Sequence, residues 1–299
     1  MGLKELLAEK RVVVTDGATG TWLAEKGELL PGQPPELLNL SNPEAIKKAH
    51  REYLEAGSEI ILTNTFGANP FKLARLNLAE KTEEINRQGV LLARKARENT
   101  RALIAGDIGP SGELLAPLGN LSAEKLSSGY QKVVSVLADG GVDLFLLETF
   151  SSLKEAEIIA ETVLKTSSLP IIVSLTFAIG KRGPRTLMGE SPEDAARAFE
   201  NSIFSLGTNC GGDSREIITI ISALKKQTSL PLWAKPNAGG PRLSEGKTVF
   251  PESPEDAAIL AKELADAGVK FIGGCCGTTP AHVRAIKKIF KFAVSGKIG

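Results

Sequence analysis

Histidine and cysteine, two side chains that transition metals favour as ligands, are scarce in this sequence. The 299 residues include two histidines and three cysteines. Because two of the cysteines, Cys275 and Cys276, are adjacent, the sequence excludes a secreted fold held together by several disulfides. Each cysteine therefore needs an explanation other than a disulfide framework.

The sequence also lacks an excess of charge and a long hydrophobic run. Lys and Arg number 36 and Asp and Glu 35, a net charge of +1, which argues against capture of nucleic acid or of an anionic membrane. No apolar run approaches the roughly 20 residues that span a bilayer. The charged stretch Met1–Lys10 has no signal-peptide core. We therefore expect a cytoplasmic protein with no nucleic-acid or membrane partner.

What the sequence does contain is a regular alternation of short apolar runs and helical patterns. The runs are continuous rather than alternating, which is typical of strands buried on both faces. Eight strands are predicted, at 12–14, 60–62, 103–105, 144–147, 171–173, 203–206, 232–234 and 271–272. A length of 299 residues fits eight such units in one domain. We predict an α/β fold, a (β/α)8 TIM-type barrel that forms a single domain over residues 1–299.

Helix starts are marked by a capping residue before proline, at Asn42-Pro43, Ser191-Pro192 and Ser253-Pro254. Further helical patterns cover 80–99, 122–140, 152–166, 213–227 and 280–290. Two segments rich in proline or glycine, Leu29–Leu40 and Pro241–Pro251, are predicted to be long loops after the first and seventh strands.

Polar and glycine-rich motifs follow the predicted strands, where barrels of this kind carry their active sites. Any single motif could be an ordinary turn or helix cap. Their presence at all eight strand ends predicts a lined cavity. They are Asp16–Gly20, Thr63–Gly67, Gly106–Pro110, Glu148–Phe150, Ser174–Phe177, Gly207–Gly212, Lys235–Gly239 and Gly273–Thr279.

All three cysteines lie in these motifs, next to glycines, at the ends of the sixth and eighth strands. A free cysteine is more often a small buried residue. Three thiolates that leave a fourth position open are, however, what a catalytic zinc site needs, and thiolates select zinc over magnesium or calcium. We predict that Cys210, Cys275 and Cys276 bind Zn²⁺ and form the catalytic centre. His50 and His282 fall within helical patterns and are expected to be structural or exposed.

These motifs resemble the homocysteine S-methyltransferase family. The resemblance is carried by Asp16–Gly20, Thr63–Phe66, Asn209-Cys210 and the specific motif Gly273-Gly274-Cys275-Cys276-Gly277, and it extends over about residues 10–290. Gly106–Glu113 and Pro236–Gly239 are similar to the homocysteine-binding N-terminal module of cobalamin-dependent methionine synthase. The resemblance implies a (β/α)8 barrel with zinc on the three cysteines.

The resemblance also implies roles for matched positions. The loop of Asp16, Gly17, Ala18 and Thr19 would bind the amino-acid end of L-homocysteine, and Glu148 would accept a hydrogen bond from its ammonium group. The other residues that would line the site or orient its ligands are Asn64, Asp107, Ser174 and Asn209.

The resulting expectation is zinc-dependent methylation of L-homocysteine to methionine. The donor would be methylcobalamin carried by a separate corrinoid protein or by cobalamin- and folate-binding modules, since no Asp-x-His-x-x-Gly corrinoid signature is present in a chain that ends at Gly299. Three alternatives stay open at this point. The donor could be S-methylmethionine or betaine, the acceptor another small thiol or selenol, or the protein a non-catalytic zinc-binding or redox barrel.

Overall fold

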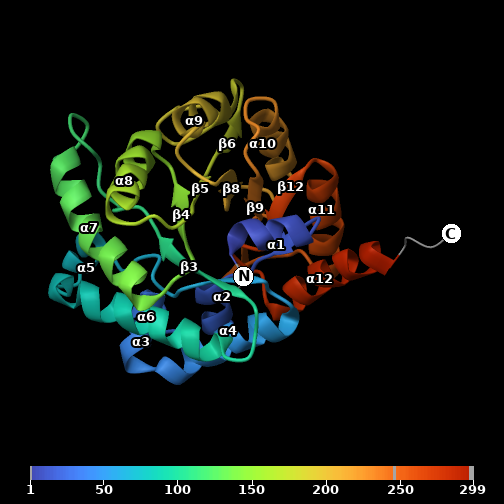
Figure 1. The fold of residues 1–299 in the computed structure, drawn as a ribbon, viewed down its shortest axis with the longest axis horizontal. Helices are drawn as coiled ribbons and strands as arrows, with labels where there is room; N and C mark the ends of the chain where they lie inside the picture. The colour runs from blue at the N-terminus through green and yellow to red at the C-terminus, as the bar shows by residue number, and fades with distance from the viewer. Residues whose placement is uncertain (1, 245–246, 296–299) are drawn as a thin grey trace.

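The computed structural model describes residues 2–244 and 247–295, which form eight parallel strands surrounded by helices (Figure 1). Parallel bridging between Thr15 and Ile60 brings the first strand against the second and closes the ring. The predicted α/β barrel is confirmed. Around the ring, the strands run in the order β1 (Val13–Val14), β12 (Val269–Ile272), β9 (Leu232–Lys235), β8 (Ser205–Asn209), β5 (Ile171–Leu175), β4 (Leu144–Phe150), β3 (Leu103–Ile108) and β2 (Ile60–Leu62).

Helices follow the strands where the capping signals predict them. The side chains of Asn42, Ser191 and Ser253 each accept a hydrogen bond from the backbone N–H three residues later, which fixes these helix starts. The long outer helices are α4 (Pro43–Ala56), α6 (Thr82–Arg97), α7 (Ala123–Gly140), α8 (Leu153–Thr166), α9 (Pro192–Phe199), α10 (Glu216–Lys225), α11 (Pro254–Asp266) and α12 (Pro280–Ser295). Shorter pieces are α2 (Thr19–Glu25), α5 (Pro70–Ala74) and the 3₁₀ turn η2 (Ala79–Lys81).

Helix α1 (Leu3–Glu9) lies across one end of the ring (Figure 1). Its Leu3 and Leu6 are buried with side chains that point into the barrel, among them Trp233 and Phe271, whose ring centroids are 5.7 Å apart. A separate and larger apolar cluster lies between the strands and the outer helices. The barrel interior is therefore filled and closed at the end where the strands begin.

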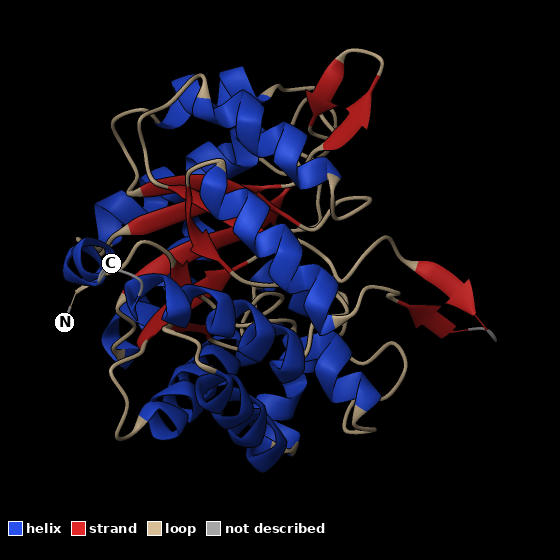
Figure 2. Ribbon diagram, turned by 90° about the vertical axis from the view of Figure 1, so that its right-hand side faces the viewer, coloured by secondary structure: helices blue, strands red, loops and turns tan. Residues whose placement is uncertain are grey.

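Two antiparallel hairpins project from the opposite end, away from the N-terminus (Figure 2). The first joins β6 (Ala178–Gly180) to β7 (Gly183–Arg185), and the second joins β10 (Arg242–Ser244) to β11 (Lys247–Val249). The second hairpin corrects the prediction of a plain loop over Pro241–Pro251, because the backbone of Arg242–Ser244 pairs with that of Lys247–Val249.

The other predicted loop, Leu29–Leu40, is also more ordered than expected. It contains the 3₁₀ turn η1 (Pro35–Leu37) and most of α3 (Leu38–Ser41). Proline at the first helical position favours this turn, and burial of Leu38 anchors it against α2 and α4.

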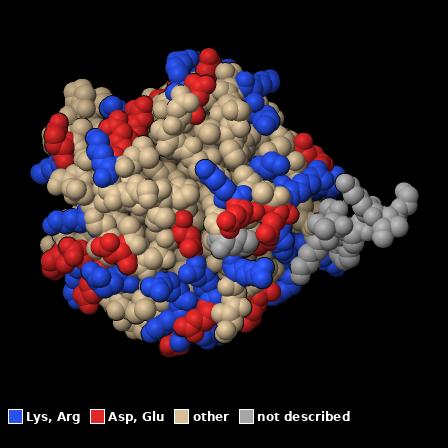
Figure 3. Space-filling view, in the orientation of Figure 1, with Lys and Arg blue, Asp and Glu red and all other residues tan. Residues whose placement is uncertain are grey.

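Acidic and basic side chains alternate over the face that carries α1 (Figure 3), in keeping with the balanced composition. Among the described residues, every helix is too short or too polar to span a bilayer.

Candidate metal and substrate site

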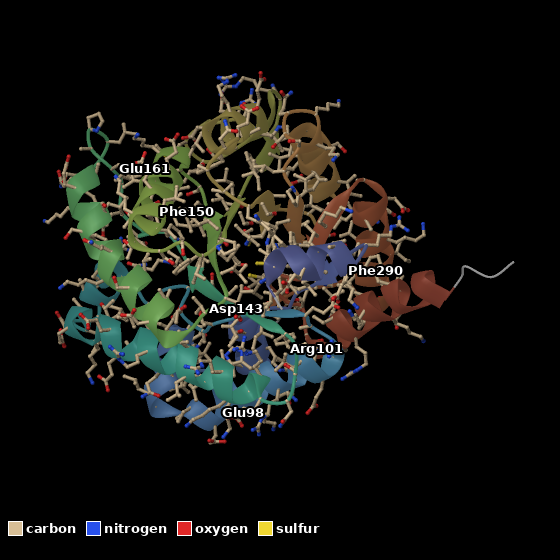
Figure 4. All side chains as sticks on the ribbon, viewed as in Figure 1. Glu98, Arg101, Asp143, Phe150, Glu161 and Phe290 are labelled. Carbon is tan, nitrogen blue, oxygen red and sulfur yellow. The ribbon has the colours of Figure 1, made fainter. Side chains whose placement is uncertain are left out.

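The strand ends opposite α1 surround a cavity of about 550 Å³. Of the predicted site residues, its lining includes Gly17, Ala18, Thr19, Asn64, Asp107, Glu148, Cys210, Cys275 and Cys276. The remaining three, Asp16, Ser174 and Asn209, lie behind this lining and are almost completely buried. A larger hollow of about 1030 Å³ near α1 is bordered by Glu98, Arg101 and Asp143 (Figure 4), but its lining includes no thiol.

The three cysteines converge at this cavity from the ends of two strands that β9 separates. Cys210 follows β8, while Cys275 and Cys276 follow β12, and the three sulfur atoms lie within 4.8 Å of one another. Cys210 has a φ of +59° and Gly211 a φ of +88°, so the chain turns sharply where the first thiol is placed. A left-handed cysteine costs about 1–2 kcal/mol, and such strain is typical of functional positions.

Hydrogen bonds among the three thiols shift their pKa values. The pKa of Cys210 is lowered to about 3, because Cys275 and Cys276 donate hydrogen bonds to its thiolate. Hydrogen bonds to Cys210 and then to Cys275 raise the pKa of Cys276, and the hydrogen bond to Cys210 raises the pKa of Cys275 to about 11. The neighbouring thiols thus stabilise negative charge on the sulfur of Cys210. A soft divalent cation that replaces the two protons suits this donor set.

Glycines let the strand ends approach this closely. A Cβ atom on Gly273 would lie 1.9 Å from Oγ1 of Thr15 and 2.6 Å from the carbonyl oxygen of Asp16. On Gly274 it would lie 2.4 Å from Oγ1 of Thr278. Gly273 is therefore required by the contact between the first and last strand ends, and Gly274 by the close turn that brings Thr278 back over it.

Asn209 connects the thiols to β4. Its Oδ1 accepts hydrogen bonds from the backbone N–H of Thr149 at 3.1 Å and from the hydroxyl of Ser174 at 2.6 Å. Its Nδ2 donates to Oγ1 of Thr149 at 2.6 Å and to the sulfur of Cys275 at 3.7 Å. Thr149 has a φ of +61°, so Asn209 holds a left-handed residue in place beside Glu148.

The first strand end is tied to the cysteine loop through Tyr53. Its buried hydroxyl donates to the carbonyl oxygens of Ala18 at 2.8 Å and Thr278 at 3.1 Å. The hydroxyl of Thr278 accepts from the N–H of Ala18 at 3.1 Å. Gly17 has no room for a side chain, because a Cβ atom would lie 2.8 Å from both the Tyr53 ring and Thr278. The loop and the cysteines are therefore held as one unit.

Lys235 begins one of the polar strand-end motifs but was not among the predicted substrate- or metal-binding residues, and it lies in the lining of the cavity. The side chain ends β9 and is 3% exposed, with Nζ 3.1 Å from Oε1 of Glu148 and 3.3 Å from Oδ1 of Asp16. Burial by itself lowers the pKa of this lysine, but the two carboxylates outweigh it and raise the pKa above its ordinary value. Lys235 is therefore a charged residue inside the barrel mouth.

The ends of the second and third strands contribute two polar side chains, of which one has its hydrogen-bond partners and the other, among the described residues, does not. Asn64 donates through Nδ2 to the carbonyl of Pro35 at 2.8 Å and to Oδ1 of Asn39 at 2.9 Å, so much of its capacity serves the fold. Asp107 is 5% exposed, and its Oδ1 has no hydrogen-bond partner in the part of the chain that the structure describes. Glu36, which the sequence did not single out, is another buried carboxylate in the lining.

Both histidines lie outside the cavity lining, within helices as predicted. His50 in α4 is 1% exposed, and His282 in α12 is 7% exposed and bonded to Thr279. Because both side chains are buried, the two histidines are structural rather than exposed.

Residues 13–290 match the family described as homocysteine S-methyltransferase. The chain belongs to this family. Methionine synthase of Mycobacterium leprae is 30% identical to it over 300 residues, which cover 95% of this chain and 24% of that protein. Methionine synthase of Mycobacterium tuberculosis is also 30% identical, over 93% of this chain and 24% of its own length. The chain thus spans about a quarter of these relatives.

A solved structure of the same family agrees with the fold. The homocysteine methyltransferase MmuM of Escherichia coli has a TM-score of 0.80 and 27% identity, and the alignment covers 96% of this chain and 99% of that one. It has been described in a metallated and an oxidized form. The family match, the fold and the cysteine geometry are therefore consistent with one another.

Proposed function

We propose that this chain methylates the thiol of L-homocysteine to give methionine, with Zn²⁺ on Cys210, Cys275 and Cys276. The observation that carries the proposal is the convergence of three sulfur atoms within 4.8 Å at a cavity that also holds buried charged groups. Family membership supports the acceptor. In this proposal residues 1–299 are one homocysteine-binding domain, located in the cytoplasm, where thiols stay reduced.

The donor set fits zinc. Three thiolates leave a fourth position for a substrate sulfur, and bound zinc would favour the deprotonated form of that sulfur at neutral pH. The chain's own residues then position the reactants. The backbone of Gly17, Ala18 and Thr19 faces the amino-acid end of the substrate, and Asn209 steadies Cys275 through its amide.

Methyl transfer requires one displacement. The homocysteine thiol first loses its proton to water. The sulfur lone pair then forms the S–CH₃ bond, and the bond from the methyl group to its donor breaks with the electron pair left on the donor. Because the sulfur is already ionised, no strong general base is needed in the cavity. Alignment of the sulfur and the methyl group is the main contribution of the protein.

We propose a methylcorrinoid, carried by a partner protein or another module, as the donor. The likeness of Gly106–Glu113 to the cobalamin-dependent branch supports this, as do relatives named methionine synthase. The alternative donor class is S-methylmethionine or betaine. It is supported by MmuM, because this chain matches almost the whole length of that homocysteine methyltransferase and only a quarter of the methionine synthases.

The decisive experiment mixes zinc-loaded protein with L-homocysteine and one donor at a time. With methylcobalamin we expect demethylation in the corrinoid spectrum, methionine as product, and loss of both on chelation. Readdition of zinc should restore the native protein but not Cys210→Ala, which is the matched control. Methionine formed from S-methylmethionine or betaine alone would transfer the proposal to that donor class. Full activity and zinc content in Cys210→Ala would refute the metal centre.

A further inference from the structure

Exposed hydrophobic side chains gather at the end of the barrel that carries the thiols. Among the described residues, twelve large hydrophobic side chains are exposed, and nine of them lie in the loops that follow β1, β2, β3, β5 and β9. The two most exposed are Leu187 at 82%, just after β7, and Leu243 at 81%, within β10. A single exposed leucine is ordinary, but several around one opening mark an interaction site.

The β6–β7 hairpin lies beside the turn that carries Cys210. A hollow of about 570 Å³ lies between them, and its lining includes Ile179 and Leu187 on the hairpin side and Gly211 and Gly212 on the other. The two glycines directly follow Cys210. Exposed apolar groups therefore stand next to the backbone that positions the first thiol.

The β10–β11 hairpin is held on the loop of the paired cysteines. Phe250, directly after β11, packs so closely on Gly277 that a Cβ atom there would overlap its ring. The N–H of Glu252 donates to the carbonyl oxygen of Ala238 at 3.0 Å, and the N–H of Ala238 donates to that of Cys276 at 2.9 Å. Each hairpin therefore stands next to one of the two turns that carry the thiols, and both project from the same side (Figure 2).

The hairpin segments are also basic. Residues 178–188 and 241–244 contain four basic residues and no acidic residue, and residues 245–249 add one of each sign. The segments thus carry a net charge of +4, whereas the whole chain carries +1. In a symmetric dimer the same surface would face itself, so these charges would repel one another. The charge therefore favours an acidic partner over a second copy of the chain.

We propose that residues 178–188, 241–244 and 248–249, the hairpin surface, dock a protein that carries the methylcorrinoid donor and is acidic around that group. The inference rests on the proposed function, because it concerns the donor of that reaction. A small sulfonium or ammonium donor needs no such surface, whereas a carrier protein must hold its methyl group over the thiols. In the two mycobacterial methionine synthases, about three quarters of the protein lies outside the match to this chain, which leaves ample chain for such a contact.

The test supplies one donor in two forms. Free methylcobalamin is compared with methylcobalamin on the separately expressed cobalamin-binding module of a cobalamin-dependent methionine synthase, with zinc-loaded protein and L-homocysteine. Leu187→Ser combined with Leu243→Ser should lower kcat/KM for the loaded module by about tenfold or more, as loss of interface anchors does, and leave kcat/KM for free methylcobalamin within about twofold. Leu164→Ser combined with Ile259→Ser, on α8 and α11, is the matched control and should change neither. All four side chains are exposed, so circular dichroism and zinc content should match the native protein.

The charge of the hairpin surface is tested in the same assay. Lys181→Glu combined with Arg242→Glu should lower kcat/KM for the loaded module by about tenfold at low ionic strength. It should also abolish the decrease that the native protein shows as salt is added. Lys125→Glu combined with Lys132→Glu makes the same change of charge on exposed positions of α7 and should keep the native salt dependence.

The outcomes separate the two proposals. Equal losses with both forms of the donor, or no loss with either, overturn the docking surface and leave homocysteine methylation standing. Reaction of the native protein with free methylcobalamin but not with the loaded module has the same meaning. A dimer in sedimentation that dissociates in the leucine variant assigns the surface to a second copy and overturns the proposed partner. Absence of methionine with every donor overturns the proposed function itself.

Discussion

Replacement of Asn209 by alanine tests how the zinc-binding thiols are held against strand β4. The substitution leaves two donors without their acceptor, the backbone N–H of Thr149 and the hydroxyl of Ser174. Orphaned buried groups cost about 1–3 kcal/mol each. Ser174 is fully buried and Thr149 partly exposed, so we take about 2 and about 1 kcal/mol and expect a loss of about 3 kcal/mol in unfolding free energy.

Ser174→Ala is the matched control. It removes one hydroxyl donor but leaves Oδ1 of Asn209 with the N–H of Thr149, so the expected loss is about 1 kcal/mol. The difference of about 2 kcal/mol corresponds to a factor of roughly 30 in the ratio of folded to unfolded protein.

Urea unfolding of metal-free, reduced protein measures both losses, because bound zinc would add its own stabilisation. The slope of free energy against urea should stay constant while the midpoint falls. A second measurement concerns the metal, since Asn209 donates to the sulfur of Cys275. Loss of such an outer contact typically weakens zinc binding by about 10- to 100-fold. Equal stability and equal zinc affinity in the two variants would refute the reasoning.

Two further predictions concern packing and pH. Gly273→Ala forces a Cβ atom to 1.9 Å from Oγ1 of Thr15 and should lower the unfolding free energy by about 1–3 kcal/mol. Gly180→Ala, which has open space around the new atom, is the control and should change the unfolding free energy by about 0.5 kcal/mol or less. Urea unfolding measures both variants, and equal losses would contradict the prediction. Burial lowers the pKa of His50 from 6.5 to about 4, so the unfolded chain binds this proton first and stability is lost as the pH falls from about 6.5 to 4. His50→Leu should remove up to about 3 kcal/mol of that loss, and an unchanged pH profile of unfolding would contradict the assignment.

The barrel was predictable from the sequence because its strands are buried on both faces. Continuous apolar runs report that burial directly, and all eight predicted strands exist. The predicted ends of the strands were less accurate where the strand continues into polar residues. The sixth strand was expected at 203–206, but β8 covers Ser205–Asn209, because ladder pairing with β9 continues through its polar end. Apolar periodicity carries no information about that pairing.

The β6–β7 hairpin was missed for a related reason. Its residues are exposed in β6 and half-buried in β7, and they include two glycines and a proline, so neither alternation nor an apolar run marks the hairpin. Backbone pairing between Ala178 and Arg185 forms it instead. The cysteines were found because their residue type is rare in this chain and their glycines are specific, and both signals are local in sequence.

Lys235 was not predicted as a site residue because lysine side chains are usually exposed to solvent. Its burial depends on closure of the ring, because β9 is neighbour to neither β1 nor β4 and Nζ meets Asp16 and Glu148 only where the strand ends converge on the barrel mouth. That arrangement explains why the cavity has two chemically distinct parts. One part offers three sulfur ligands, and the other offers the buried carboxyl groups of Asp107 and Glu148, each with an oxygen that has no hydrogen-bond partner among the described residues. A redox or purely metal-binding barrel would need the first part alone. In the proposed reaction a single ligand, an amino-acid thiol, would meet both parts.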